Sequence, residues 1–174
     1  MKIFDYLLIV FVSLSIISGC KKDDLPKATQ IGANVVAARV NGQVWESKAC
    51  WSCFGGGKGL SVNYDDRNFF GVSAQQKDEN KSITITFVIT SLKSVGTYSL
   101  SGEGKNQGHL SNYAERNAAV HYITSDNNKG TIRVTKLDLA NKIVSGTFEF
   151  TAEDKTNPAN TIRVTDGRFD VTFN

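Results

Sequence analysis

The stretch Ser82-Ile83-Thr84-Ile85-Thr86-Phe87-Val88-Ile89 (SITITFVI) decides the fold class of this 174-residue chain. Its apolar residues at positions 83, 85, 87 and 89 fall on every second place, so one face of an extended strand would lie in a core and the other in water. The segment Val144–Ala152 shows the same alternation. Because no window carries the 3.6-residue apolar period of a helix, the sequence predicts an all-β domain.

A tight hairpin is indicated on the N-terminal side of this stretch. Asn41-Gly42 separates Val35–Val40 from Gln43–Glu46, and Asn-Gly between two apolar segments is a strong hairpin signal. A two-residue turn at this point places Ala38 opposite Trp45, so that a small residue makes room for the indole ring.

The last predicted strand, Thr161–Phe173, contains an irregularity. Its apolar positions change from even to odd numbers at Asp166-Gly167, where a β-bulge would absorb the extra residue. Further strands are expected at Leu60–Tyr64, Phe69–Gln75, Thr97–Leu100, Ala118–Thr124 and Gly130–Leu137. About nine or ten short antiparallel strands in one domain (residues 35–174) favour a β-sandwich, with a barrel as the alternative.

The N-terminus differs in composition from the rest of the chain. Residues 1–19 hold 13 apolar side chains, and the run Tyr6–Ile17 is too short to span a bilayer but suits a secretory signal. The run ends in Ile17-Ser18-Gly19-Cys20, which resembles the lipobox of bacterial lipoproteins. The resemblance implies that residues 1–19 are a lipoprotein signal peptide and that Cys20 is lipidated. An ordinary cleaved signal peptide is the alternative.

The residues after Cys20 carry a second resemblance. Lys22-Asp23-Asp24 is similar to the surface-export signal of Bacteroidota lipoproteins, and a plain charged tether is the alternative. The resemblance implies an outer-membrane lipoprotein at the cell surface, with the periplasmic face as the other location. Residues 20–34 lack an apolar period, so we expect the lipidated cysteine to be followed by a flexible linker that reaches about 45–50 Å when stretched.

The composition and charge restrict the class of protein to which the chain can belong. The chain is 40% apolar and has 20 Lys and Arg against 17 Asp and Glu, a formal net charge of +3. These values are ordinary for one soluble domain behind a leader, and they exclude a multidomain, polytopic or disordered protein. Nothing in the charge balance points to a nucleic-acid partner.

Cys50 and Cys53 form the most specific chemical motif. In an exported protein two such cysteines are expected to pair as a structural disulfide. A redox pair, a metal site or free thiols are the alternatives, but a redox pair needs a helix N-terminus and a run of glycines follows Cys53. His109 and His121 lack the spacing of zinc ligands, so we expect no metal and no cofactor.

Aromatic residues in or beside the predicted loops give the best lead to a ligand. Trp51, Phe54 and Tyr113 lie in or near the segments Cys50–Gly59 and Ser101–Asn117. Loop aromatics on a rigid β scaffold stack on sugars or contact partner proteins in many domains, although they also simply cover the ends of a sandwich. We therefore take these three residues as candidate ligand contacts.

Two parts of the chain resemble a known family. Arg39–Trp45 (RVNGQVW) and the segments Gly130–Ile132, Ile143–Phe148 and Thr165–Phe169 are similar to small Bacteroidota outer-membrane lipoproteins that carry a domain of unknown function. The resemblance rests on turn and core positions. It implies fold and location and carries over no catalytic residue.

Two functions of different classes remain. The first is a membrane-anchored binding or interaction module whose partner is a glycan or an envelope protein. The second is an exported redox or hydrolytic enzyme that uses Cys50 and Cys53, or the histidines His109 and His121. Because no acid–base constellation can be identified, the sequence favours the first.

Overall fold

The computed structural model describes residues 24–49, 59–78, 81–102, 104–114 and 119–174, which form eleven strands and no helix. None of these residues belongs to a helix long and apolar enough to cross a membrane. The strands are β1 Val35–Val40, β2 Gln43–Glu46, β3 Leu60–Tyr64, β4 Phe70–Lys77, β5 Lys81–Ile89, β6 Gly96–Leu100, β7 Gln107–Ala114, β8 Val120–Ile123, β9 Gly130–Asp138, β10 Ile143–Asp154 and β11 Thr161–Thr172. The all-β class is thus confirmed.

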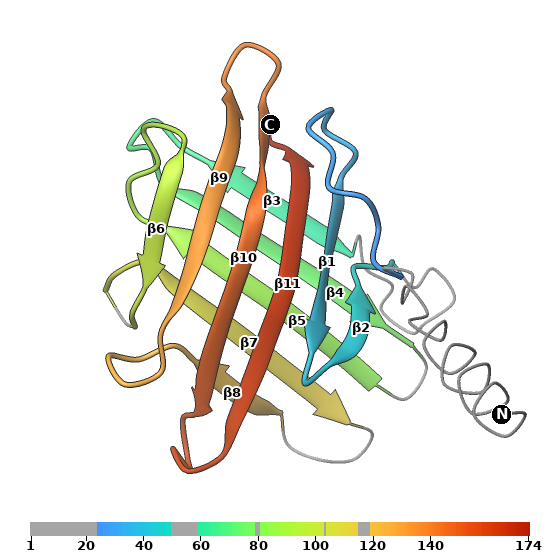
Figure 1. Ribbon diagram of the computed structural model, residues 1–174, viewed down its shortest axis with the longest axis vertical. Helices are drawn as coiled ribbons and strands as arrows, with labels where there is room; N and C mark the ends of the chain where they lie inside the picture. The colour runs from blue at the N-terminus through green and yellow to red at the C-terminus, as the bar shows by residue number, and fades with distance from the viewer. Residues whose placement is uncertain (1–23, 50–58, 79–80, 103, 115–118) are drawn as a thin grey trace, which may run out of the picture.

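The strands form one antiparallel sheet that curls into two layers (Figure 1). Its main order is β2-β1-β11-β10-β8-β7-β5-β4-β3, and β9 and β6 branch from the other part of β10. The front layer of Figure 1 contains β6, β9, β10, β11, β1 and β2, and the other five strands cross behind it. The layers join through β10 and β8, and an isolated bridge between Lys48 and Gln76 brings the chain after β2 to β4. The result is a half-barrel.

Four phenylalanine rings fill the centre between the layers. Phe70 and Phe87 come from the rear layer, and Phe148 and Phe169 come from the front layer. The ring centroids of Phe87 lie 4.9 Å from Phe148 and 5.1 Å from Phe169. The alternation of SITITFVI places Phe87 here, because its neighbours Thr86 and Val88 face away from the core.

Both special turns of the sequence occur as expected. Asn41 and Gly42 have φ angles of 48° and 81°, which a type I′ hairpin turn requires, and Ala38 lies opposite Trp45. The register between β10 and β11 shifts next to Asp166, whose φ is 53°. The hairpin and the bulge are therefore confirmed.

One strand was not expected from the sequence. The sequence predicts a loop over Ser101–Asn117, but residues 107–114 form β7, which pairs with β5 along its length and with β8 over residues 109–112. Its core-facing positions hold Gly108, Leu110 and Asn112, so the apolar alternation that marks a strand is too weak to detect. The pairing of β7 with the strongly patterned β5 overrides this low local propensity.

The segment before β1 lies against the sheet. Residues 24–34, which we call the strap, were expected to belong to the flexible linker. Leu25 is buried, and the Gln30 amide reaches β9, where it donates to Thr135 Oγ1 at 3.0 Å. On β11, the backbone N–H and the hydroxyl of Thr172 both donate to Asn34 Oδ1, each at 2.9 Å. Tertiary contacts order a segment whose own sequence has no regular pattern.

Asp170 is the main attachment point of the strap. Its buried carboxylate accepts five hydrogen bonds. The donors are the hydroxyls of Thr29 and Ser145 and the backbone N–H groups of Ile31, Gly32 and Ala33. Burial by itself would raise the pKa of Asp170, but these hydrogen bonds outweigh burial and lower the pKa from 3.8 to about 2.

Candidate functional site

Most of the residues singled out in the sequence lie outside the described part of the chain. They are Cys20, Lys22, Asp23, Cys50, Trp51, Cys53 and Phe54. The lipidation, the export signal, the disulfide and two of the three aromatic contacts therefore stay predictions. Asp24 is described and forms an ion pair with Arg39, with 2.6 Å between Oδ1 and Nη2.

The outer face of the rear layer carries a polar surface on β5, β7 and β8. Strand alternation directs Thr84 and Thr86 of β5 outward, because Ile85 between them is buried. In the ladder with β7, Thr86 lies opposite His109 and Thr84 lies opposite Ser111. The next strand, β8, adds outward-facing side chains beside these. The face is rich in hydroxyl groups that can both donate and accept hydrogen bonds.

A row of three rings crosses this surface. His109 and His121 stack with their ring centroids 5.6 Å apart, and Tyr113 meets His121 edge-on at 6.1 Å. Ser111 lies between the imidazoles, with its Oγ 3.0 Å from His121 Nδ1 and 3.5 Å from His109 Nε2. Tyr113 is 46% exposed. We call Tyr113, His121, Ser111 and His109 the ring row.

A hollow of about 450 Å³ adjoins the ring row. It is lined by Thr86, Val88, Gly104, Gln107, His109, Ile123 and Lys155. Within the described part of the chain the buried Oε1 of Gln107 has no hydrogen-bond partner. Trp45 Nε1 and Asn112 Oδ1 share this property, but their strand positions face the core. Gln107 thus holds an acceptor that the protein itself does not satisfy, and the side chain must turn into the hollow for a ligand to reach this oxygen.

The electrostatics of the hollow favour neutral imidazole at His109. Burial of the ring lowers the pKa of His109 below its ordinary value of 6.5, and the charges of His121 and Lys155 lower it further. A neutral imidazole has one donor and one acceptor nitrogen. Because Nε2 faces Ser111, the other ring nitrogen, Nδ1, is the one that can bond a hydroxyl group of a ligand.

A comparison with protein families identifies the domain. A model described as a domain of unknown function, DUF6252, matches residues 33–171 of the chain. The chain belongs to the DUF6252 family. The match begins two residues before β1 and ends one residue before the end of β11, so the DUF6252 unit is the whole half-barrel. No curated protein and no solved structure matches the chain.

The ring row and its hollow present aromatic and imidazole rings and hydroxyl groups at the surface of the DUF6252 domain. Among the described residues no cluster of three or more His, Cys, Asp or Glu side chains is placed to hold a metal ion. The backbone amides around Ser111 belong to the ladders of β7 with β5 and β8. An oxyanion needs donors that are not already bonded in this way.

Sequence reasoning found parts of this site but not the whole. The sequence predicts Tyr113 as a candidate contact, and it raises His109 and His121 only as zinc ligands or catalytic groups. Ser111 and Gln107 were missed, because their significance depends on the pairing of β7 with β8. A weak signal existed: Gln107, His109, Ser111 and Tyr113 occupy every second position, as side chains on one face of a strand do.

Proposed function

We propose that this chain is a lipoprotein anchored at Cys20 and displayed at the cell surface, and that its DUF6252 domain binds a glycan at the ring row. The anchor is supported by the sequence Ile17-Ser18-Gly19-Cys20. The observation that carries the binding proposal is the exposed Tyr113 ring in line with two imidazoles, beside the hollow that contains the unpartnered Gln107 carbonyl.

The two ends of the site would recognise different parts of an oligosaccharide. The exposed face of Tyr113 provides apolar contact for the C–H face of a pyranose ring. The neutral His109 ring provides hydrogen bonds for hydroxyl groups that enter the hollow, and Gln107 Oε1 accepts another once its side chain turns toward them. Thr86 lines the same hollow and supplies a hydroxyl that can act as donor or acceptor.

Binding of neutral oligosaccharides tests the proposal. The purified chain is applied to an oligosaccharide array, and the affinity of each hit is measured by calorimetry. Tyr113→Ala should weaken binding about tenfold, because the lost aromatic contact is worth about 1.4 kcal/mol. Leu139→Ala is the matched control, since Leu139 is similarly exposed (56%) but lies at the tip between β9 and β10.

Two results would contradict the binding proposal. One is an array without any hit at millimolar sugar. The other is a hit whose affinity is the same for wild type, Tyr113→Ala and Gln107→Ala. Capture of an envelope protein that is lost in Tyr113→Ala would keep the ring row as the contact surface and replace the glycan by a protein partner.

A hydrolytic function is the second candidate, and one observation favours it. Ser111 Oγ lies within hydrogen-bond distance of His121 Nδ1, which is the relation of a nucleophile to its base. The test is labelling by a fluorophosphonate probe, which should modify wild type and spare Ser111→Ala if Ser111 is a nucleophile.

For the redox alternative, the rate at which the reduced chain is alkylated is measured as a function of pH. This rate reports whether the thiol of Cys50 or Cys53 has a lowered pKa.

A further inference from the structure

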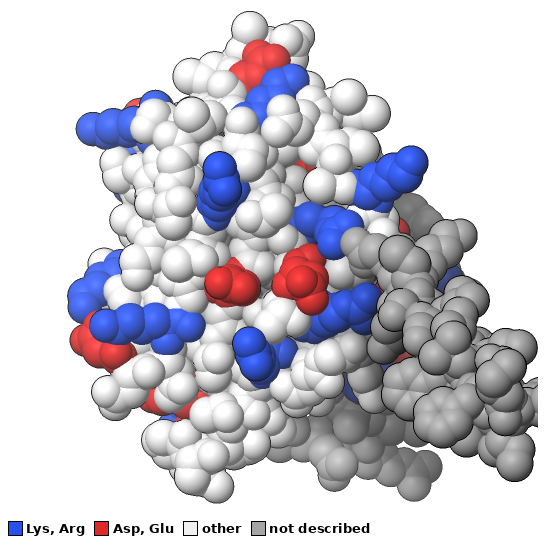
Figure 2. Space-filling model, in the orientation of Figure 1, with Lys and Arg blue, Asp and Glu red and all other residues white. Residues whose placement is uncertain are grey.

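The outer face of the front layer contains a second hollow, of about 560 Å³, remote from the ring row. Figure 2 looks onto this face and shows acidic side chains near its middle with basic side chains around them. The hollow is lined by Ala28, Thr97, Thr131, Arg133, Thr147, Phe148, Glu149, Asp166, Gly167 and Arg168. Its volume falls in the range of about 300–1,000 Å³ that small-molecule sites have.

The sheet register sorts the charges of this hollow into two rows. Thr147 of β10 lies between Arg133 of β9 and Arg168 of β11, so two guanidinium groups flank one small side chain. Glu149 is the next outward-facing residue of β10, about 6.7 Å further along the strand. Asp166 lies in the bulge of β11 beside Glu149. One row is cationic and the next is anionic.

Two of these four charges are already engaged with the rest of the protein. Arg168 donates to the carbonyl of Pro26 in the strap at 2.8 Å. Asp166 faces Arg39, with 3.6 Å between Oδ2 and Nε. These contacts fix one cation and one anion in the walls of the hollow.

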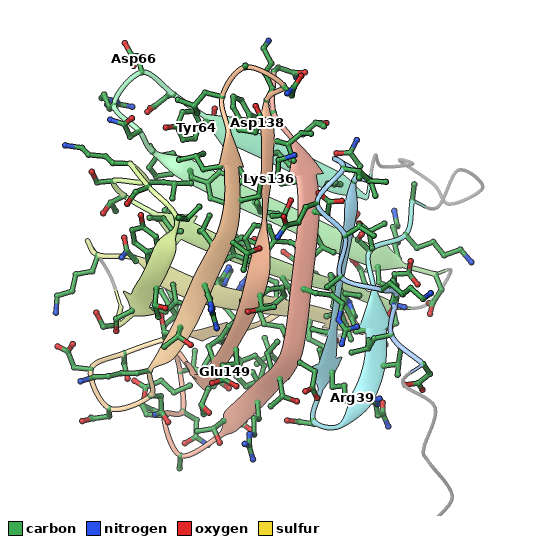
Figure 3. All side chains as sticks on the ribbon, turned by 45° about the horizontal axis from the view of Figure 1, so that its top comes forward. Arg39, Tyr64, Asp66, Lys136, Asp138 and Glu149 are labelled. Carbon is green, nitrogen blue, oxygen red and sulfur yellow. The ribbon has the colours of Figure 1, made fainter. Side chains whose placement is uncertain are left out.

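Arg133 and Glu149 are the other two, and they are exposed. Neither makes a hydrogen bond or an ion pair with any side chain in the described ranges. They are diagonal neighbours across β9 and β10, because Glu149 pairs with Thr131 and Arg133 with Thr147. Diagonal neighbours lie about 7–8 Å apart, which leaves space between the two charged groups. Figure 3 labels Glu149 on β10.

We propose that this hollow binds a small zwitterion, with its phosphate or carboxylate between Arg133 and Arg168 and its ammonium at Glu149. A guanidinium presents several N–H donors in a plane and suits a phosphate or carboxylate oxygen pair. An ammonium has three donors and no acceptor, so it needs an acceptor-only group such as a carboxylate. A simple anion would use only the cationic row of the hollow, and a simple cation only the anionic row.

Titration of the full chain in detergent with phosphoethanolamine, methyl phosphate and ethanolamine tests the proposal. Phosphoethanolamine should bind at least tenfold more tightly than either single-charge probe. Glu149→Gln should remove this advantage and leave the affinity for methyl phosphate within twofold of wild type. Arg133→Gln should weaken both phosphate probes at least tenfold. Lys142→Gln is the matched control, because Lys142 is an exposed cation in the turn before β10 and does not line the hollow.

The substitutions change exposed side chains, so circular dichroism should show an unchanged fold. The proposal is overturned if methyl phosphate binds as tightly as phosphoethanolamine, if Glu149→Gln has no effect, or if none of the probes binds at millimolar concentration. An equal loss in Lys142→Gln also overturns it, since that result would indicate a non-specific effect of charge. Tighter binding of glycerophosphoethanolamine than of phosphoethanolamine would identify a lipid headgroup as the source, and the reverse would identify a free monoester.

Discussion

Replacing Asp170 by asparagine should release the strap and cost a large part of the stability of the domain. At 1.36 kcal/mol per pKa unit, the fall from 3.8 to about 2 means that folding favours the ionised carboxylate by about 2.4 kcal/mol. An asparagine loses this charge and also turns an NH₂ group toward donors such as Gly32 N–H or Ser145 Oγ. One unsatisfied donor costs about 1–3 kcal/mol more, so we expect a loss of about 3–5 kcal/mol.

Chemical denaturation of wild type and Asp170→Asn at neutral pH measures this loss. Asp126→Asn is the control, because Asp126 is an exposed carboxylate paired with Lys105, and such a pair is worth under about 1 kcal/mol. The pH dependence of stability separates the effect of losing the charge from the effect of losing a hydrogen-bond acceptor. A lowered carboxylate pKa stabilises the fold fully above 3.8 and progressively less as the pH falls toward 2. The difference in the free energy of unfolding between wild type and Asp170→Asn should become smaller as the pH falls over this range. A loss below 1 kcal/mol at neutral pH would refute the reasoning.

Three other changes have expected outcomes. Gly146→Ala should destabilise the domain by about 1–3 kcal/mol in a denaturant titration, because its Cβ would collide with the Arg133 carbonyl and the Phe169 ring; unchanged stability would contradict this packing. His109→Gln should reduce the fall in thermal midpoint between about pH 7.5 and pH 5.5, because a His pKa below 6.5 in the folded state lets the unfolded chain bind more protons there. Equal slopes for variant and wild type would argue against a lowered pKa. Cys20→Ala should abolish acyl labelling and release the protein from the membrane fraction, and a variant that stays bound and labelled would disprove the anchor.

The strands that could be predicted from the sequence are those whose local pattern agrees with their place in the sheet. The alternation in SITITFVI indicates which of its side chains are buried. Asn41-Gly42 indicates a hairpin turn, because few residues other than glycine and asparagine tolerate the positive φ that this turn requires. Residues 107–114 lack such a pattern. They are extended because β5 and β8 offer pairing partners on both sides, which is information that no window of the sequence contains.

The candidate sites were predictable to a smaller extent for the same reason. Tyr113 could be identified as an aromatic in a polar segment, but its approach to His121 depends on the register between β7 and β8. The order of the strap was also not predictable. The residue that holds it, Asp170, is 141 positions away from Thr29 in the sequence, and a single carboxylate in an alternating strand carries no sign of its partners.

The pairing of β1 with β11 has a consequence for the order of events during synthesis. The first strand of the domain, Val35–Val40, has its ladder with the last strand, Thr161–Thr172, and the strap is held by the same last strand. An emerging chain can form the local hairpin of β1 with β2, but the hydrogen-bonding edge that faces β11 stays unpaired until the C-terminus has been made. A chain exported through a membrane would therefore remain incompletely folded throughout its passage, and ribosome-bound chains that end before β11 should be digested by protease within β1.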